Sequence, residues 1–313
     1  FHSFGQRLLR RFADIAGLPP EPMLLDSAQQ RRLLRSIIRE HGLYPGARAS
    51  GIDSAVAHAS SMIETLRNHA ITPETAVERA QRVLDSDQDD ESLALAQRFL
   101  GAARAYGLFE GACRERGWMS FSDMVLAPIR LLRESEMVRD ICRGELRHVV
   151  VDEFQDVNRA QIELLRGLAP PGGRAELCVV GDDDQAIYAF RGADEQAFAH
   201  FREIWTDAET IALTESYRSQ RAIIDASQAT IARCAERFEP DKAIERAASL
   251  SGEAPLAGAG VEVVRVEDDG QHGEIVAAMI LADMASRPGA RLSDYAVIAR
   301  THTDADRVRR ALE

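Results

Sequence analysis

Two carboxylate clusters thirty residues apart are the side chains of this chain best suited to chemistry. Asp152 and Glu153 follow the apolar run 149–151, and three aspartates at 182–184 follow the apolar run 178–180. Adjacent residues at a strand end point in different directions, so one carboxylate of the first pair can hold a magnesium ion through its waters while the other deprotonates an attacking water. This division suits nucleotide hydrolysis, which depends on positioning and charge neutralisation. Acidic residues also end strands because loops are solvated, but like charges crowded on one edge cost stability unless a cation or ligand offsets them.

The elements that must position these carboxylates are two buried parallel strands. Short β-branched runs that stop at carboxylates are typical of such strands, and ligands bind at the carboxyl ends of a parallel sheet. The thirty-residue spacing matches one strand–helix–strand crossover. Asn158 can cap the connecting helix, whose apolar face is Ile162, Leu165 and Leu168. The sequence therefore predicts that the two acidic clusters lie side by side on one edge.

The residues after the second cluster combine an amide, two aromatic rings and a guanidinium in one short stretch. Gln185 is followed by Tyr188, Phe190 and Arg191. Aromatic rings beside a phosphate-handling site can stack on bases, and an arginine can pair with phosphate. The alternative interpretation is that one of the two rings simply belongs to the core.

A third polar cluster follows the segment Thr210–Leu213. It contains Tyr217 and Arg218, and a long helix is expected from there to about Phe238. The arginine can reach a γ-phosphate from the side opposite the magnesium ion, and the tyrosine can cover an adenine ring. Both are equally compatible with ordinary surface positions.

Taken together, these segments resemble the UvrD/Rep family of superfamily 1 DNA helicases. The resemblance is carried by VVVDEFQDVN, VVGDDDQAIYAFRGA and LTESYRS in this order and at these spacings. FHSFGQRLLRR resembles the family's single-strand-binding motif just after the nucleotide-binding loop, and the short segments at 121–125 and 295–301 resemble further motifs of the family. The resemblance covers essentially the whole chain.

The resemblance implies a nucleotide site built from five residues. Asp152 would be the metal ligand that holds Mg²⁺, and Glu153 would act as the general base. Gln185 would sense the γ-phosphate of ATP and couple it to DNA. Tyr217 would stack on adenine, and Arg218 would contact the γ-phosphate.

The resemblance also implies a DNA site. Phe1 and His2 would lie in the DNA groove. Tyr188 and Phe190 would contact or stack on single-stranded bases, with Arg191 nearby.

The chain departs from the family in two side chains and lacks one motif. The family usually has Trp where Phe190 stands and Asn where Ser216 stands, which puts the stacking and the polar contact at these positions in doubt. A phosphate-binding loop needs Gly-x-x-x-x-Gly-Lys-Ser/Thr. The only lysine is Lys242, which has no glycine frame. We therefore expect an internal piece of a longer helicase that does not hydrolyse ATP alone; the alternative is a short protein that kept the surface without the motor.

The predicted fold class is α/β. We expect an incomplete RecA-like P-loop NTPase motor domain with an all-helical insert, and the start of a second RecA-like α/β domain. The predicted boundaries are 1–20 with 117–206 for the first motor domain, 21–116 for the insert, and 207–313 for the second motor domain. The strands expected in the second domain are Thr210–Leu213, 261–266 and 295–300, with a helix at His272–Ser286.

The function that the resemblance implies is ATP-dependent 3′→5′ translocation on single-stranded DNA with duplex unwinding. ATP and Mg²⁺ would be required, and the partners would be single-stranded DNA, single-strand/duplex junctions, and repair or recombination proteins. The first alternative is a non-catalytic module that binds single strands or a scaffold partner. The second is a metal nuclease using Asp152, Asp156 and the aspartates at 182–184, although such sites usually add a nearby lysine or histidine.

Composition limits the classes of function that the chain can have. The net charge is −12, but residues 1–48 carry eight arginines against four acids. This local basic strip suits contacts to phosphates, and two solvated helix faces explain it equally well. The four cysteines are scattered, which favours reduced thiols over a zinc site or a disulfide framework. No apolar run reaches the length of a membrane span, and we expect a cytoplasmic protein with no membrane partner.

Overall fold

The computed structural model describes most of the chain as two compact units. The described residues are 1–19, 21–44, 51–86, 89–234, 237–248, 260–266 and 270–313. The first unit comprises residues 1–213 and 231–242, and the second comprises 214–230 and 243–313. Each unit is described by itself.

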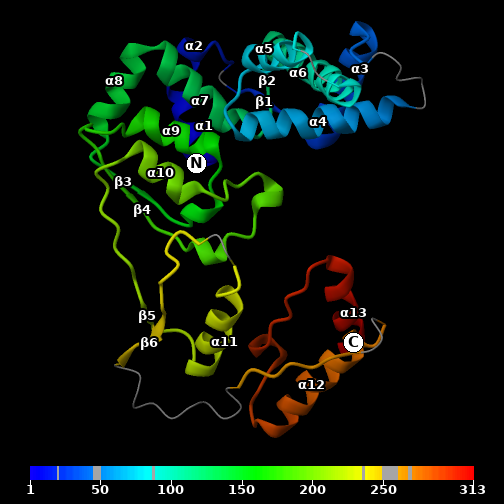
Figure 1. Cartoon of the computed structure of the whole chain (residues 1–313), viewed down its shortest axis with the longest axis vertical. Helices are drawn as coiled ribbons and strands as arrows, with labels where there is room; N and C mark the ends of the chain where they lie inside the picture. Colours follow the sequence, from blue (N-terminus) through cyan, green and yellow to red (C-terminus); the bar gives the residue numbers. More distant parts are fainter. Residues whose placement is uncertain (20, 45–50, 87–88, 235–236, 249–259, 267–269) are drawn as a thin grey trace. The chain divides into compact units, whose positions relative to one another are not determined.

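The strand–helix–strand crossover predicted from the acidic segments is confirmed. β3 (His148–Val151) pairs in parallel with β4 (Glu176–Val179), with Val150 opposite Cys178. Between them runs α9 (Arg159–Leu168), which begins at a capping box: the Asn158 side chain accepts from the backbone N–H of Gln161, and the Gln161 side chain accepts from the Asn158 N–H. The predicted apolar face of α9 is buried. This crossover fixes the two carboxyl ends of the strands next to each other (Figure 1).

Helices pack around this crossover. Figure 1 shows α1, α7, α8 and α9 together in the first unit. Their apolar faces form one hydrophobic cluster, with Val138 fully buried, and a second cluster under β3 surrounds the fully buried ring of Phe154. The elements are α1 (His2–Arg11), α2 (Ala13–Ala16), α7 (Asp123–Glu134), α8 (Glu136–Glu145) and α10 (Ala197–Ile204).

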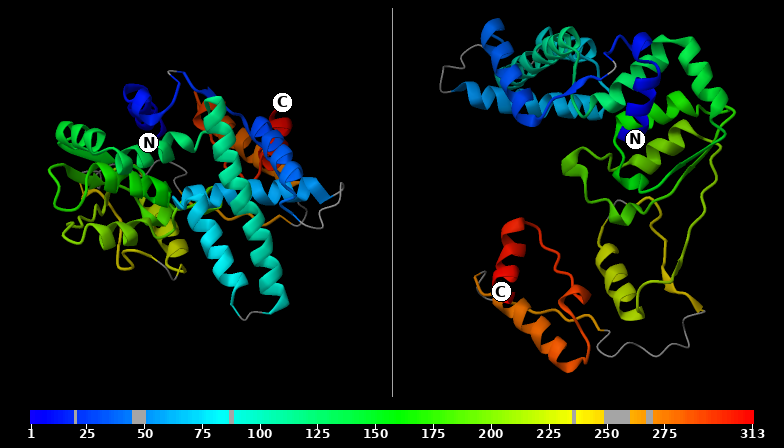
Figure 2. Two further views of the ribbon diagram at one scale, coloured as in Figure 1. Left: turned by 90° about the horizontal axis from the view of Figure 1, so that it is seen from above. Right: turned by 180° about the vertical axis from the view of Figure 1, so that it is seen from behind.

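The helices predicted between residues 26 and 116 are confirmed. α3 begins at a capping box on Asp26, α5 begins at Thr72 with proline in its first turn, and α6 ends at Gly117 in the left-handed conformation. They share a separate hydrophobic cluster, and both views of Figure 2 show them as one group. The bounds are α3 (Ser27–His41), α4 (Ile52–Asn68), α5 (Pro73–Leu84) and α6 (Asp90–Arg116).

The block 21–116 nevertheless carries a strand, which the sequence did not indicate. β1 (Met23–Leu24) pairs in parallel with β2 (Trp118–Met119). The pairing ties the start of the helical block to its end. A two-residue strand has no period that a sequence pattern can reveal, so only the pairing defines it.

The second unit differs from the prediction in its strands. The segments at Thr210–Leu213, 261–266 and 295–300 are not strands; Val263 is 91% and Ile298 97% exposed. Apolar β-branched residues become a strand only when a neighbour completes the backbone hydrogen bonds, and no described segment pairs with these. The strands that do form are β5 (Glu215–Ser216) and β6 (Glu245–Arg246), which pair in parallel.

Three α-helices lie in the described part of the second unit. α11 (Arg221–Ile231) ends well before the predicted limit near Phe238, whereas α12 (His272–Ser286) has the predicted bounds, and α13 (His302–Leu312) packs against α12. The buried residues of these two helices are apolar and include Ala277 and Ile280 of α12 and Val308 of α13. Within the described residues, no helix combines the length and the apolar character needed to cross a membrane.

Candidate functional site

The carboxylates of the first cluster stand directly at the end of β3. The strand pairing continues past β3 and β4, because the N–H of Val180 donates to Val151 O and the N–H of Phe154 donates to Val180 O. Glu153 lies between these bonds with φ of 51°, in the left-handed region. A non-glycine residue held there costs on the order of 1 to 3 kcal/mol and persists only where its surroundings fix it. The ring of Phe154 supplies that constraint, packed edge-on against Phe198 and Phe201.

A chain of hydrogen bonds joins Glu153 to Gln185. The Gln155 amide donates to Glu153 Oε2 over 2.7 Å, and its oxygen accepts from the Asp182 N–H over 3.0 Å. The Gln185 amide then donates to Asp182 Oδ2 over 2.8 Å. Gln155 is 4% exposed, so an amide that lost these partners would leave polar atoms buried. The predicted base and the predicted γ-phosphate sensor are thus connected through one buried amide.

Gly181 allows this close approach of the two strand ends. A β-carbon at this position would lie 2.4 Å from Gln155 Oε1 and 2.8 Å from the Phe154 backbone nitrogen. Neither atom can move without breaking the strand pairing or the amide bridge. The glycine is required by contact rather than by its backbone angles.

Asp152 has the character expected of a magnesium ligand. Its side chain is exposed, and one carboxylate oxygen accepts from the Glu153 N–H over 2.9 Å. Mg²⁺ uses one or two protein carboxylates and completes its octahedron with waters and substrate phosphates, so a single exposed carboxylate at this edge fits it.

The aspartates at 182–184 are held differently from what the sequence suggested. Their carboxylate oxygens lie within 4.8 Å of one another, as in a metal site. However, Lys242 Nζ lies 2.6 Å from Asp182 and 2.8 Å from Asp183, and Arg237 pairs with Asp184. The cation that offsets this acidic edge is therefore supplied by the protein itself.

Asp156 is the last residue of the short helical turn Phe154–Asp156 that follows β3. Its Oδ1 is buried and has no hydrogen-bond partner among the described atoms. Burial, with the charge of Glu153, raises its pKa. It lines a cavity of about 530 Å³ that lies beside the motif segments.

That cavity gathers three of the five residues predicted to contact DNA. His2, Tyr188 and Arg191 line it, and the His2 ring stacks on Phe121 with centroids 3.9 Å apart. The Arg191 guanidinium lies 4.9 Å from the centre of the Tyr188 ring. Burial, together with the amino-terminal charge, lowers the pKa of His2, so its ring is an aromatic surface more than a cation at neutral pH. Flat rings beside a guanidinium are suited to bases and phosphates of a single strand.

The other two predicted DNA contacts lie elsewhere. Phe1 packs against the two clusters around α9 and lines a separate apolar cavity of about 400 Å³ along β3. Phe190 is 80% exposed, with its ring 6.1 Å from that of Tyr188. Phe1 is therefore partly buried against these clusters, whereas Phe190 is exposed and can reach a ligand from the surface.

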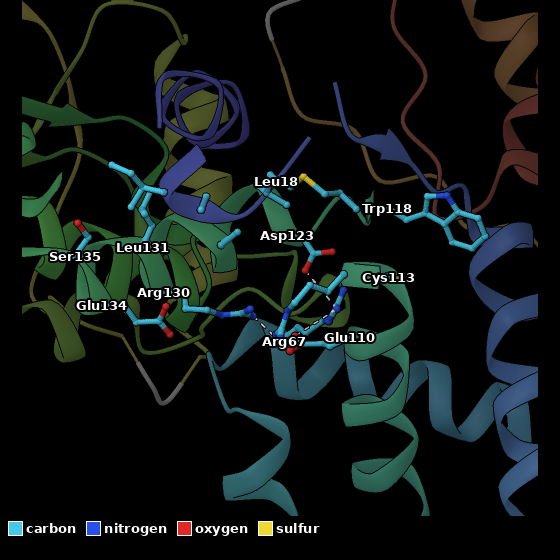
Figure 3. A pocket seen from close by; sticks show the side chains of 15 residues that line it. Leu18, Arg67, Glu110, Cys113, Trp118, Asp123, Arg130, Leu131, Glu134 and Ser135 are labelled. Atoms are coloured by element: carbon cyan, nitrogen blue, oxygen red, sulfur yellow. Dashed lines mark hydrogen bonds and ion pairs between the residues drawn. The ribbon is translucent and has the colours of Figure 1, made fainter. Parts of the chain in front are cut away.

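The carboxyl end of α4 attaches the helical block to this site. Arg67 is 4% exposed, and its guanidinium pairs with Glu110 and Asp123 at 3.6 and 3.4 Å and donates to Ser120. Figure 3 shows this cluster at a second cavity of about 350 Å³. Burial opposes the charge of Arg67, but Asp123, Tyr106 and Glu110 outweigh it and raise its pKa.

The next residue, Asn68, contacts both acidic segments. Its Oδ1 accepts from the Asn158 amide over 3.0 Å, at the start of α9. On its other side, a β-carbon at Gly192 would lie 2.0 Å from the Asn68 amide, which places α4 in contact with the loop that carries Tyr188. The helical block is thus joined to the segments after both strands.

Residues 1–205 match the family described as UvrD/REP helicase N-terminal domain. The chain belongs to the UvrD/REP helicase family. It is 33% identical to the ATP-dependent DNA helicase UvrD1 of Mycobacterium bovis over 96% of this chain and 36% of that protein. It is 30% identical to PcrA of Staphylococcus epidermidis over 76% of this chain and 30% of that protein, and 28% identical to Rep of Escherichia coli over 96% and 40%.

The family assigns this chain a RecA-like α/β fold of the P-loop class. The chain spans 30% to 40% of the length of these relatives. The resemblance read from the sequence is therefore confirmed at the level of the family.

In this UvrD/REP-family chain, Tyr217 and Arg218 lie in the second unit. The Tyr217 hydroxyl donates to Glu215 Oε2 over 2.9 Å, and this bond raises its pKa. Both side chains are exposed. Their roles at adenine and the γ-phosphate stay predictions.

Sequence reasoning missed four residues that build the site. Gln155 and Gly181 connect the strand ends, and Arg67 and Asn68 anchor the helical block. One feature of the sequence could have indicated Gln155, because it is an uncharged polar residue among the acidic residues at 152–156. The α4 residues had no such feature, since an arginine and an asparagine at a helix end are common on any surface.

Proposed function

We propose that this chain is part of an ATP-dependent DNA helicase motor that moves on single-stranded DNA with 3′→5′ polarity and unwinds duplexes. The observation that carries the proposal is the continuous hydrogen-bond connection from Glu153 through Gln155 and Asp182 to Gln185. Three and six residues further on, the same loop presents Tyr188 and Arg191 to the 530 Å³ cavity. One short segment thus joins the candidate hydrolytic group to the candidate DNA surface.

The nucleotide chemistry is assigned to the edge of the sheet. Asp152 would hold Mg²⁺, which neutralises charge on the triphosphate. Glu153, freely exposed and held in its strained turn, takes the proton from the attacking water. Gln185 reports the γ-phosphate to the loop, Arg218 contacts the γ-phosphate, and Tyr217 stacks on the adenine.

The DNA surface is assigned to the cavity shared by the sheet loops, α1 and α4. Bases stack on the His2, Phe121 and Tyr188 rings, and Arg191 pairs with the backbone phosphate. Phe190 extends this surface outwards. We expect single-strand/duplex junctions as the physiological substrate and DNA repair or recombination proteins as partners.

Two features of the fold support a motor of which this chain is a part. Val150 on β3 is 70% exposed although it is flanked by strand hydrogen bonds, and it opens onto the apolar cavity lined by Phe1. The exposed apolar segments 261–266 and 295–300 are likewise free to pair. Further strands of the two RecA-like domains, including the one that leads to a phosphate-binding loop, would cover these surfaces.

The domain organisation belongs to the same proposal. Residues 1–20 with 117–206 form the first motor domain, 21–116 form an inserted helical domain, and 207–313 form the second RecA-like domain.

The test uses the complete product of the gene that encodes this chain. Glu153→Gln is expected to lower DNA-stimulated ATP hydrolysis by roughly 10² to 10⁴-fold while leaving single-strand binding unchanged. The matched control is Glu176→Gln, on the opposite end of the sheet, where the side chain is 81% exposed. Full turnover in Glu153→Gln would refute the assignment of the base.

The alternative of a non-catalytic binding module makes a different forecast. It predicts that the complete product binds single strands but hydrolyses no ATP with or without DNA. Single-strand binding alone, with no turnover in the wild type, would therefore decide for that module.

A further inference from the structure

The acidic edge is clamped by a segment that follows α11 in the chain. We call residues 237–242 the strap. Its one lysine, Lys242, contacts three successive carboxylates, with Nζ at 2.6, 2.8 and 3.0 Å from Asp182, Asp183 and Asp184. Arg237 donates twice to the carboxylate of Asp184, both times over 2.8 Å.

Backbone and aromatic contacts complete the attachment. The Phe238 N–H donates to Asp183 Oδ2 over 2.7 Å, and the Phe238 ring lies 5.4 Å from that of Phe198. Phe198 in turn packs on Phe154, the residue that follows Glu153. The strap therefore contacts the aspartates directly and connects to Phe154 through the ring of Phe198.

The charges in this clamp are removed from bulk water. The side chains of Arg237 and Lys242 are 11% and 12% exposed, and that of Asp184 is 13% exposed. Burial alone lowers the pKa of Lys242, but the hydrogen bonds to the three carboxylates outweigh it and raise the pKa. Removing one partner of a pair this buried leaves an uncompensated charge, which is why such clamps hold their geometry.

The carboxylate of Asp182 is shared between the strap and the nucleotide loop. Its Oδ1 accepts from Lys242 and its Oδ2 accepts from Gln185, while its N–H donates to Gln155. Lys242 therefore fixes the orientation of the one carboxylate that holds Gln185. The ammonium group also occupies the centre of the aspartate cluster, which argues against a metal ion at that place.

The strap lies in the chain between two elements of the second unit. α11 precedes it, with all but its last residue in the second unit, and β6 follows it in that unit.

We propose that Lys242 is a positioning residue, which acts through Asp182 to set Gln185 for the γ-phosphate. This inference rests on the proposed function. Its structural part and its functional part are tested separately, so that each can fail without the other.

The structural part is tested on the 313-residue chain by acylation of its amines with an N-hydroxysuccinimide ester. Lys242 is the only lysine, so peptide mass spectrometry follows one side chain, with the Phe1 amino group as an internal standard. Only the neutral amine reacts, and one pKa unit changes its fraction about tenfold. We expect Lys242 to react at least about tenfold more slowly in the folded chain than in urea, and Asp182→Asn with Asp183→Asn to remove most of that protection. Equal rates in folded and unfolded chains would overturn the clamp.

The functional part uses the complete gene product and the double variant Lys242→Met with Asp183→Asn. The double variant removes the contact to Asp182 but keeps the net charge of the clamp, which limits unfolding; Asp183→Asn alone is the matched control. Misplacing a catalytic group by about 1 Å costs up to roughly 10²-fold, so we expect kcat for DNA-stimulated ATP hydrolysis to fall by about 10 to 10²-fold. KM for ATP and Kd for single-stranded DNA should change by less than about threefold, and Lys242→Arg should restore most of kcat.

The outcomes separate the two proposals. An unchanged kcat in the double variant, in a protein whose Glu153→Gln form is inactive, would overturn the role of the strap alone. A wild-type protein without ATP hydrolysis would overturn the proposed function and this role together, while the acylation rates still decide the clamp.

Discussion

The buried amide of Gln155 gives the sharpest test of how the site is held together. Its replacement by leucine keeps the volume nearly constant but removes both hydrogen bonds, 2.7 Å to Glu153 and 3.0 Å from the Asp182 N–H. The Asp182 N–H then lacks its partner, at a cost of about 1 to 2 kcal/mol. The bond to Glu153 is partly exposed and contributes about 0.5 to 1 kcal/mol. We therefore expect Gln155→Leu to lower the free energy of unfolding by about 2 kcal/mol.

The assay is urea denaturation of the 313-residue chain followed by tryptophan fluorescence. Trp205 is 7% exposed and stacks on Phe201 in the cluster beneath Glu153, so its emission reports the part of the first unit that contains the site. Trp118→Phe is introduced throughout so that Trp205 is the only fluorophore of this kind. The slope of the unfolding curve should stay the same, since the change exposes no new surface in the unfolded chain.

The control is Gln196→Leu, an exposed glutamine whose side chain is in a loop before α10. It should change stability by less than about 0.5 kcal/mol. If Gln155→Leu also stays within that limit, the amide bridge does not hold the two strand ends together, and the connection from Glu153 to Gln185 loses its physical basis.

Four further predictions follow from the same geometry. Arg67→Met leaves Asp123 and Glu110 without their buried cation, and the same denaturation curve should show a loss of about 3 to 5 kcal/mol, with Arg130→Met as the exposed control. Gly181→Ala forces its β-carbon against Gln155 and Phe154 and should cost about 1 to 3 kcal/mol. Tyr188→Ala should weaken binding of a labelled single-stranded oligonucleotide by roughly 5 to 100-fold in fluorescence anisotropy, since one stacked base contributes about 1 to 3 kcal/mol, whereas Tyr295→Ala in the second unit should leave it unchanged. The pKa of Asp156 is raised in the folded chain above its ordinary 3.8, so the free energy of unfolding falls as the pH rises from 3.8 through the folded pKa. Asp156→Asn should remove this fall and raise the free energy of unfolding at pH 7. Equal dependence of the unfolding free energy on pH in the two proteins would refute the assignment.

Much of the first unit was predictable because its signals are local. The β-branched runs before Asp152 and Asp182, the capping residue Asn158 and the apolar period of α9 each act within a few residues, and together they predicted the crossover and its acidic edge. The family resemblance added the roles of these residues, which local pattern alone cannot supply.

The partners that neutralise and orient these residues were not predictable, because they are distant in the chain. Lys242 stands sixty positions from Asp182, and its sequence surroundings gave no indication of a contact. The prediction of strands at 261–266 and 295–300 was wrong because it used composition alone. The composition of these segments suits a strand, but a strand forms only when another segment completes its backbone hydrogen bonds.

The sequence by itself determined the parallel strand pair, the helix between them and the carboxylates at their ends, since propensity, capping and apolar period are properties of neighbouring residues. Only the tertiary structure decided that Gln155 bridges those ends, that Arg67 and Asn68 anchor the helical block, and that Lys242 rather than a metal ion offsets the aspartates. These are choices among many chemically equivalent partners. Burial makes the choice, because an amide or a charge withdrawn from water must take whichever partner the packing of the chain places within reach.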